Sequence, residues 1–141
     1  MYKPKYFTIK ELVNPDLLKK IGEETAWKMF DDRLLKAADQ IREKYGTIVV
    51  NTSTLKDCGL RDPQSTTGAK YSMHKIGRAL DLHIVSIEKK WPGNKSGKTA
   101  DYNRVREQLM MDSRFDCLSF EHNIHWLHID TGNRKNRLFN P

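Results

Sequence analysis

Three residues in two short segments of this chain have the types and spacing of a metal site. His74 and Asp81 lie close together in the segment Ser72–Asp81, and His128 follows much later, in Trp126–Asp130. Two histidines and a carboxylate form a ligand set that a catalytic zinc ion uses when its fourth position is kept for water. We therefore predict that His74, Asp81 and His128 bind one zinc ion, and a hydrolase is the first functional hypothesis.

A predicted hairpin places a carboxylate beside this metal site. The segments Cys117–Glu121 and Trp126–Asp130 read as two strands that are joined by a loop of four residues. Such a loop sets Glu121 opposite Trp126 and makes His128 its diagonal neighbour on the same face, at roughly 7–8 Å between backbones. A side chain at that distance can reach a water held at the metal.

Two residues are candidates for the general base of a zinc hydrolase. Zinc lowers the pKa of a bound water to about 7 and polarises a carbonyl oxygen, so a nearby base completes the nucleophile. Glu121 could take the proton and pass it to the leaving amine. His125 is the alternative, because a neutral imidazole could do the same or could stabilise the tetrahedral intermediate. The hairpin geometry favours Glu121.

Hydrophobic periodicity predicts the elements that position these residues. A strand begins near Ala79, and Asp81 and His83 share its polar face, opposite an apolar face formed by Leu80, Leu82 and Ile84. The other expected elements are a short helix opening with the capping box Thr8–Glu11, a helix from Asp31 or Asp32 to Gly46, a strand over 47–50, a loop over 51–69 and a helix capped by Thr99. The predicted fold class is α+β, with a small antiparallel sheet flanked by helices and the zinc site on one sheet face.

Length and composition predict a single domain. A chain of 141 residues is enough for one stable core and cramped for two. We divide it into N-terminal helices over residues 1–46 and a motif-bearing catalytic core over residues 47–137. No apolar run is long enough for a membrane span, and the N-terminus lacks a signal-peptide pattern, so we expect synthesis into the cytoplasm. In that compartment Cys58 and Cys117 are expected to be free thiols, and the protein a monomer.

The basic charge of the chain raises nucleic acid as a possible partner. Lys and Arg number 25 against 18 Asp and Glu, which gives a formal charge of +7. The basic residues are spread along the chain, and no aromatic residues alternate with them in the pattern that stacks on bases. We therefore expect no nucleic-acid partner, and a positive surface would equally attract another polyanion, such as a cell-wall polymer.

The pattern Ser-x-His-x-x-Gly-x-Ala-x-Asp, followed by Trp-x-His, resembles the M15 family of zinc peptidases. That family includes D-alanyl-D-alanine carboxypeptidases and phage L-alanyl-D-glutamate endolysins. The stretch Cys58–Pro63, the stretch Gly68–Ser72 and the ending Asn133–Arg137 are similar to a compact form common in phages. The resemblance spans residues 47–137 and implies a zinc site at the three predicted ligands, on a small sheet flanked by helices, as in hedgehog and D-Ala-D-Ala peptidase folds.

The resemblance also implies roles for further residues. Arg61 resembles an arginine that binds substrate near the metal, and Ser72 a serine that fixes the loop or the substrate. With Trp126 they are the expected substrate-binding residues. Gly77 resembles the turn glycine between the ligands. Many relatives carry an acidic residue three positions before the last histidine, where this chain has His125, whereas phage forms place the acid earlier, in agreement with Glu121.

The expected activity is hydrolysis of an amide bond in the peptide stem of bacterial peptidoglycan. A phage-type lytic enzyme that reaches the wall after release fits the absence of a signal pattern. Both a carboxypeptidase and an endopeptidase are compatible with the motif. Two other hypotheses stay open: a zinc-binding module without catalysis, as in hedgehog signalling domains, and a basic nucleic-acid-binding protein.

Overall fold

A mixed five-stranded sheet forms the centre of the structure, a computed structural model that describes residues 1–141. The strand order is β1-β2-β4-β3-β5, and neighbours are antiparallel except for the parallel pair β3 and β5. The strands are β1 (Ile48–Val49), β2 (Ala79–Ile84), β3 (Ser119–Glu121), β4 (Leu127–Asp130) and β5 (Leu138–Phe139). The predicted α+β class is confirmed. The wholly antiparallel sheet is wrong, because the two-residue strand β5 is too short to show an alternating pattern.

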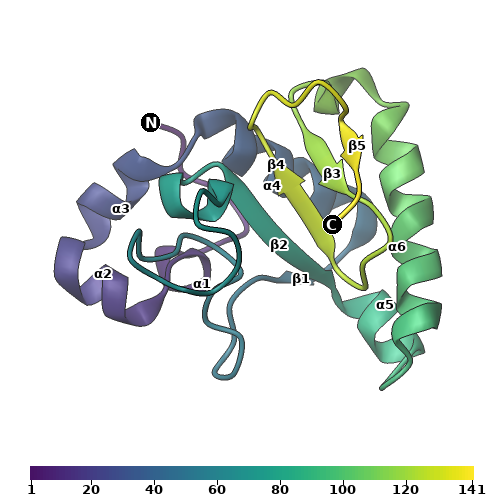
Figure 1. Cartoon of the computed structure of the whole chain (residues 1–141), viewed down its shortest axis with the longest axis horizontal. Coiled ribbons are helices and arrows are strands. Elements are labelled where there is room, and N and C mark those ends of the chain that lie inside the picture. The colour runs from purple at the N-terminus through teal and green to yellow at the C-terminus, as the bar shows by residue number, and fades with distance from the viewer.

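Helices flank this sheet, as predicted. They are α1 (Ile9–Leu12), α2 (Pro15–Ile21), α3 (Glu23–Met29), α4 (Asp32–Tyr45), α5 (Val85–Lys90) and α6 (Lys95–Met110), with 3-10 helices at Met73–Ile76 and Ser113–Phe115. Helices α1 to α3 gather at one end of the molecule, and α6 runs along the other end (Figure 1). Helix α4 lies behind the sheet in this view. No helix combines the length and the hydrophobicity that crossing a bilayer requires. Both cysteines are free, as expected.

Capping residues explain where the two long helices begin. The Asp31 side chain accepts a hydrogen bond from the backbone N–H of Arg33, and Gly46 ends α4 with a φ of +85°, so this helix is confirmed. The predicted cap of the second helix is wrong. Asn94 caps α6 by accepting from the N–H of Gly97, whereas Thr99 lies inside the helix. Asparagine is at least as good a cap as threonine, so the helix starts five residues earlier.

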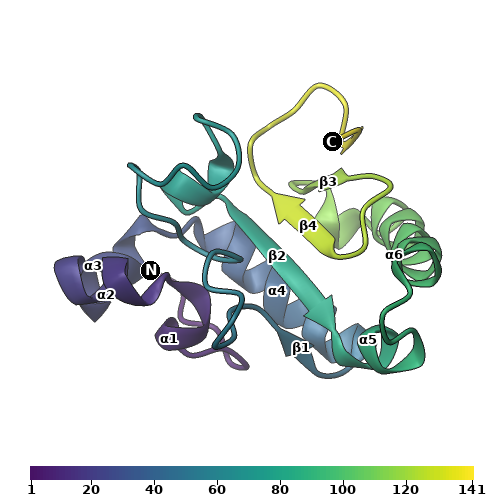
Figure 2. The same cartoon turned by 60° about the horizontal axis from the view of Figure 1, so that its bottom comes forward.

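Apolar and polar side chains alternate along β2, so one face of the strand packs in the core and the other faces the candidate site. Leu80, Leu82 and Ile84 are at most 1% exposed and belong to the hydrophobic core. Helix α4 covers this face (Figure 2). Burying such a side chain contributes about 1.5–3 kcal/mol, and a one-residue slip would turn all three outward, so the register of β2 is strongly specified. Asp81 is thereby fixed on the opposite face.

The predicted register of the C-terminal hairpin is wrong by two residues. Ser119 pairs with Asp130 and Phe120 with Ile129, so continuing the ladder sets Glu121 opposite His128 rather than opposite Trp126. The connection contains residues 122–126, because Trp126 lies outside β4. Glu121 and His128 are therefore direct cross-strand neighbours, whose Cβ atoms are typically about 4.5–5.5 Å apart, closer than the predicted diagonal pair.

A tight turn at Gly77 connects the 3-10 helix Met73–Ile76 to the loop before β2. Gly77 has a φ of +70°, and a Cβ at this position would overlap the carbonyl oxygen of Met29. The backbone therefore needs glycine for two reasons, its left-handed conformation and its close approach to α3. This agrees with the turn role expected for Gly77.

We expect Gly77→Ala to lower the free energy of unfolding by about 2–4 kcal/mol, because it combines a strained φ with an overlap against backbone. The matched control is Gly93→Ala. Gly93 has a φ of +67°, but a Cβ there meets nothing within 4 Å, so only the conformational cost of about 1 kcal/mol applies. Urea unfolding of both variants measures the difference. Equal losses would contradict the close approach at Gly77.

Candidate metal centre

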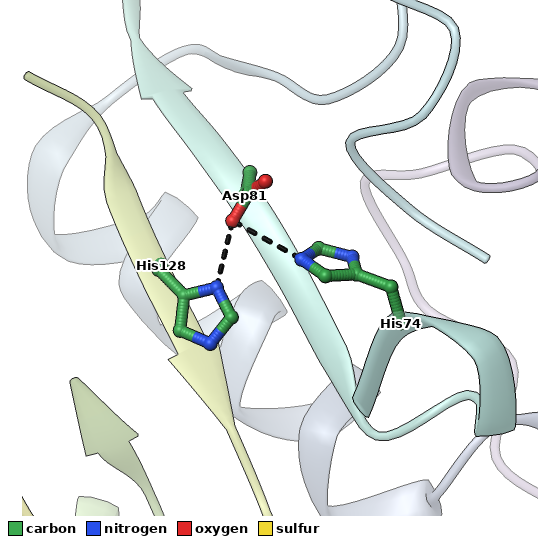
Figure 3. Close-up of side chains that lie close together, drawn as sticks. All are labelled: His74, Asp81 and His128. Atoms are coloured by element: carbon green, nitrogen blue, oxygen red, sulfur yellow. Dashed lines mark hydrogen bonds and ion pairs between the residues drawn. The ribbon is translucent and has the colours of Figure 1, made fainter. Parts of the chain in front are cut away.

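Three elements bring the predicted metal ligands together on the open face of the sheet. His74 comes from the 3-10 helix Met73–Ile76, Asp81 from β2 and His128 from β4 (Figure 3). Asp81 and His128 are direct partners in the β2–β4 ladder. The Asp81 Oδ1 atom lies 3.3 Å from His74 Nε2 and 2.8 Å from His128 Nδ1. All three side chains are buried, and their ligand atoms lie within 4.8 Å of one another.

Each imidazole has an outer partner that fixes which nitrogen faces Asp81. His74 Nδ1 lies 3.0 Å from the carbonyl oxygen of Gly59, which can only accept a hydrogen bond, so Nδ1 is the donor there and Nε2 is the nitrogen that faces Asp81. His128 Nε2 lies 2.9 Å from Asp130 Oδ2, which leaves Nδ1 toward Asp81 in the same way. A backbone carbonyl or a carboxylate behind a ligating imidazole is the usual arrangement in metal sites.

Two of the three spacings between these atoms can be compared with those around a small tetrahedral ion. Nitrogen and oxygen ligands at about 2.0–2.2 Å from a tetrahedral zinc lie about 3.3–3.6 Å from each other. The distance between His74 Nε2 and Asp81 Oδ1 is in this range, and the His128 contact would need to lengthen slightly. This buried group could therefore hold a metal ion.

The charges of the metal-free site are strongly coupled. Burial would lower the pKa of His128, but its hydrogen bonds with Asp130 and Asp81 outweigh burial and raise the pKa to about 9. Burial would raise the pKa of Asp81, yet hydrogen bonds from His128 and His74 bring it below the usual range. Burial raises the pKa of the neighbouring Cys58 thiol to about 12, so this residue is no competing thiolate nucleophile at neutral pH.

The loop around His74 is held from both sides. Ser72 caps the 3-10 helix, and its Oγ accepts from the backbone N–H of His74 at 3.2 Å. Ser72 was expected to fix the loop or the substrate, and this contact fixes the loop. Gly59 supplies the carbonyl behind His74, and a Cβ on Gly59 would overlap the carbonyl oxygen of Leu12. Sequence analysis missed Gly59, whose only signal was its place in the stretch Cys58–Pro63.

Arg61 lies beside the ligands and is mostly engaged by the protein itself. Its Nε donates to the carbonyl oxygen of Asp57 at 2.7 Å, and one terminal nitrogen lies 3.5 Å from Asp81 Oδ2. The side chain is buried, yet it lines the same cavity as the ligands. Arg61 therefore orients the outer oxygen of Asp81 and presents its remaining N–H groups to that cavity.

The two candidate bases line different cavities. The metal cavity, about 600 Å³ in volume, is lined by the three ligands and by Glu121, Trp126 and Arg134, among others. His125 is absent from its lining. It lines a second cavity of about 600 Å³, here called the side cavity, which is also lined by Cys58, His83, Glu88 and Lys98. Only Glu121 thus shares a cavity with all three ligands.

A buried arginine that sequence analysis missed holds the loop between β3 and β4. Arg106 of α6 is fully buried, and its terminal nitrogens donate to Asn103 Oδ1 and to the carbonyl oxygens of Ile124 and Trp126. Burial lowers the pKa of Arg106 to about 10, with the Glu121 carboxylate acting in the opposite direction. The sequence gives no signal for this contact, because the position reads as one turn of a solvated helix.

Replacing Arg106 by methionine should lower the free energy of unfolding by about 2–4 kcal/mol, since one buried and one partly buried carbonyl oxygen lose their donor. Arg104→Met is the matched control. The Arg104 side chain is 70% exposed and pairs only with Asp101, so its loss should change stability by less than about 1 kcal/mol. Urea midpoints of the two variants report the difference, and a control as damaging as Arg106→Met would contradict the bracing role.

The structure brings together most of the residues singled out in the sequence. The three ligands, Glu121 and the three expected substrate-binding residues line one cavity, whereas His125 and His83 lie in the adjoining one. Asp130 stands directly behind His128. This arrangement combines a possible metal site with a free carboxylate and an open cavity. Comparisons of the chain with protein-family models, with curated proteins and with solved structures each found no match.

Proposed function

We propose that this protein is a zinc-dependent peptidase that hydrolyses an amide bond in the peptide stem of bacterial peptidoglycan, with a fold of the hedgehog and D-Ala-D-Ala peptidase type. One observation carries the proposal. In the buried group His74, Asp81 and His128, two imidazole nitrogens and a carboxylate oxygen lie within 4.8 Å of one another beside an open cavity, and Glu121 is the cross-strand neighbour of His128. Zinc hydrolases use three protein ligands in this way.

The side chains of the cavity suggest a division of labour. A zinc ion held by the three ligands would polarise the substrate carbonyl and increase the acidity of water. The Glu121 carboxylate accepts a proton from the attacking water and returns it to the leaving amine, which needs a proton to depart. His128 keeps its orientation through Asp130, and His74 through the carbonyl oxygen of Gly59.

Substrate contacts are assigned to residues around the ligands. The remaining N–H groups of Arg61 can donate to a peptide carbonyl or carboxylate next to Asp81. Trp126 lines both cavities and offers its ring to the substrate chain. Ser72 lines the metal cavity while its hydroxyl holds the N–H of His74, so its contribution to binding is through the loop.

Peptidoglycan as substrate rests on the motif resemblance and on charge. The formal charge of +7 would attract the polyanionic polymers of a bacterial wall over long range. A phage-type lytic enzyme, monomeric and reaching the wall after release from the cell that makes it, agrees with the sequence.

Incubating the purified protein with purified peptidoglycan tests this function. We expect release of new amino groups with zinc bound, loss of release after treatment with a chelator, and recovery when zinc is added back. Stoichiometric zinc without any release would instead identify a non-catalytic zinc module. Salt-dependent DNA binding that does not need metal would identify a nucleic-acid-binding protein.

A further inference from the structure

A guanidinium with a free end lies in the wall of the metal cavity. Arg134 belongs to the loop over residues 131–137, which connects β4 to β5 (Figure 1), and its side chain is 38% exposed. Its Nε donates to Asp130, at 3.1 Å to Oδ2 and 3.4 Å to Oδ1. Its two terminal nitrogens donate to no group of the protein, and Asp130 is its only ion-pair partner. The terminal nitrogens are therefore available to a ligand.

Two contacts fix the orientation of this guanidinium. The first is the hydrogen bond from Nε to Asp130. The second is with Phe139 of β5, because the central carbon of the Arg134 guanidinium lies 3.9 Å from the centroid of the Phe139 ring. An aromatic face attracts a cation at this distance. Arg134 therefore loses less side-chain freedom when it binds a ligand than an unrestrained arginine would.

The same two groups also contact the candidate ligand His128. The Oδ2 atom of Asp130, which accepts from Arg134, lies 2.9 Å from His128 Nε2. The ring of Phe139 meets the ring of His128 edge to face, with their centroids 5.9 Å apart and their planes at 88°. The free end of Arg134 is thus held in a fixed place relative to the candidate metal centre. A group bound there would set the position of the substrate along the cavity.

The loop that carries Arg134 is itself held against the sheet. Arg137 donates from Nε to the carbonyl oxygen of Leu118 at 2.8 Å and from a terminal nitrogen to that of Phe115 at 2.7 Å. The strand that follows, β5, pairs with β3. Arg134 is therefore anchored on both sides of its own position.

The other two cations of the metal cavity are less suited to a carboxylate. Each of the three nitrogens of Arg61 already has a protein oxygen within 3.5 Å. Lys70 is exposed and forms no ion pair, so it is a flexible point charge at the rim. Only Arg134 keeps both terminal nitrogens free, in the planar geometry that matches the two oxygens of a carboxylate.

We propose that Arg134 binds a carboxylate of the substrate through its two terminal nitrogens, with Phe139 as a positioning residue. This rests on the function proposed above and specifies its substrate, a stem peptide with a free carboxylate near the bond that is cut. A carboxylate at the end of the chain and one on a side branch offer the same two oxygens. The shared chemistry therefore defines the ligand, and the position of the carboxylate is found by experiment.

Paired synthetic peptides test the inference. Mass spectrometry of fragments from purified peptidoglycan first identifies the bond that is cut. Stem peptides that contain this bond are then made with one free carboxylate at a time replaced by a carboxamide. One of these replacements should lower kcat/KM by about tenfold or more, because the amide keeps the shape and loses the charge-assisted hydrogen bonds. The position of that replacement distinguishes the end of the chain from a side branch.

Arg134→Gln should lower kcat/KM for the carboxylate peptide by about tenfold or more and leave the carboxamide peptide nearly unaffected, with unchanged zinc content. Lys135→Gln is the matched control. It removes the same charge from the same loop, but Lys135 is exposed and does not line the metal cavity, so the preference for carboxylate should persist.

Three results overturn the inference while the proposed function stands. They are no preference for any carboxylate in the unaltered protein, a preference that survives in Arg134→Gln, and an equal loss on both peptides in that variant. The last result would mean that Arg134 acts only through Asp130 and His128. No hydrolysis of any peptide by the zinc-loaded protein overturns both the inference and the proposed function.

Phe139→Leu tests the positioning role. Loss of the ring should reduce the preference for carboxylate over carboxamide about two- to fivefold, which is the size of a cation–π contact at an exposed site. Leu138→Ala is the control, since Leu138 is the other residue of β5 and does not line the metal cavity. An unchanged preference in Phe139→Leu overturns the assignment of Phe139.

Discussion

Replacing His74 by alanine should abolish tight zinc binding and, with it, hydrolysis of peptidoglycan. His74 is the only one of the three proposed ligands that lies outside the sheet, in the 3-10 helix Met73–Ile76. A neighbouring strand residue therefore cannot take over its position. Loss of an outer partner of a metal ligand typically weakens metal binding about 10–100-fold. Loss of the ligand itself should weaken zinc binding by more than the upper end of that range, because only two protein ligands remain.

Asp130→Asn provides a graded comparison for this prediction. Asp130 is fully buried behind His128, and asparagine keeps its shape while removing the charge that holds the imidazole. We expect zinc affinity to fall about 10–100-fold, with the protein still folded. Competition with a chromogenic chelator measures both affinities, and circular dichroism controls for folding. If His74→Ala binds zinc as tightly as the unaltered protein, the three residues are not the metal site.

The clustering of His74, Asp81 and His128 could be predicted from the sequence because the placement of these residues follows in part from local rules. Asp81 lies on the polar face of an alternating strand, and burial of the apolar face fixes that orientation. Gly77, three residues after His74, is a turn residue by type, and its φ of +70° agrees with that. Such signals lie within a few residues of the side chain that they place.

The features that sequence analysis missed depend on contacts between distant segments. Nothing near Gly59 indicates that its carbonyl will meet His74, and Arg106 reaches the loop between β3 and β4 from another element. The hairpin register failed for a different reason, which is local. A loop of five residues, with Asn123 at a φ of +59°, shifts Glu121 by two positions relative to β4, and loop length cannot be read from strand patterns alone.

Glu121→Ala should lower kcat by about 10²–10⁴-fold while zinc binding is retained, since general acid–base catalysis contributes a factor of this size. The corrected register strengthens this prediction, because it sets Glu121 opposite His128 and within the metal cavity. Glu121→Gln, which keeps the shape and removes the base, should lose as much. A rate close to that of the unaltered protein in either variant would contradict the assignment.

His125→Ala tests the alternative base. Loss of the imidazole should leave kcat within about tenfold, because His125 lines the side cavity and not the cavity that all three ligands line. If His125 were the base, kcat would fall as far as in Glu121→Ala. The pair of variants therefore assigns the proton transfer to one residue, the one whose removal lowers kcat at unchanged zinc content, and the register of β3 and β4 leads us to expect Glu121.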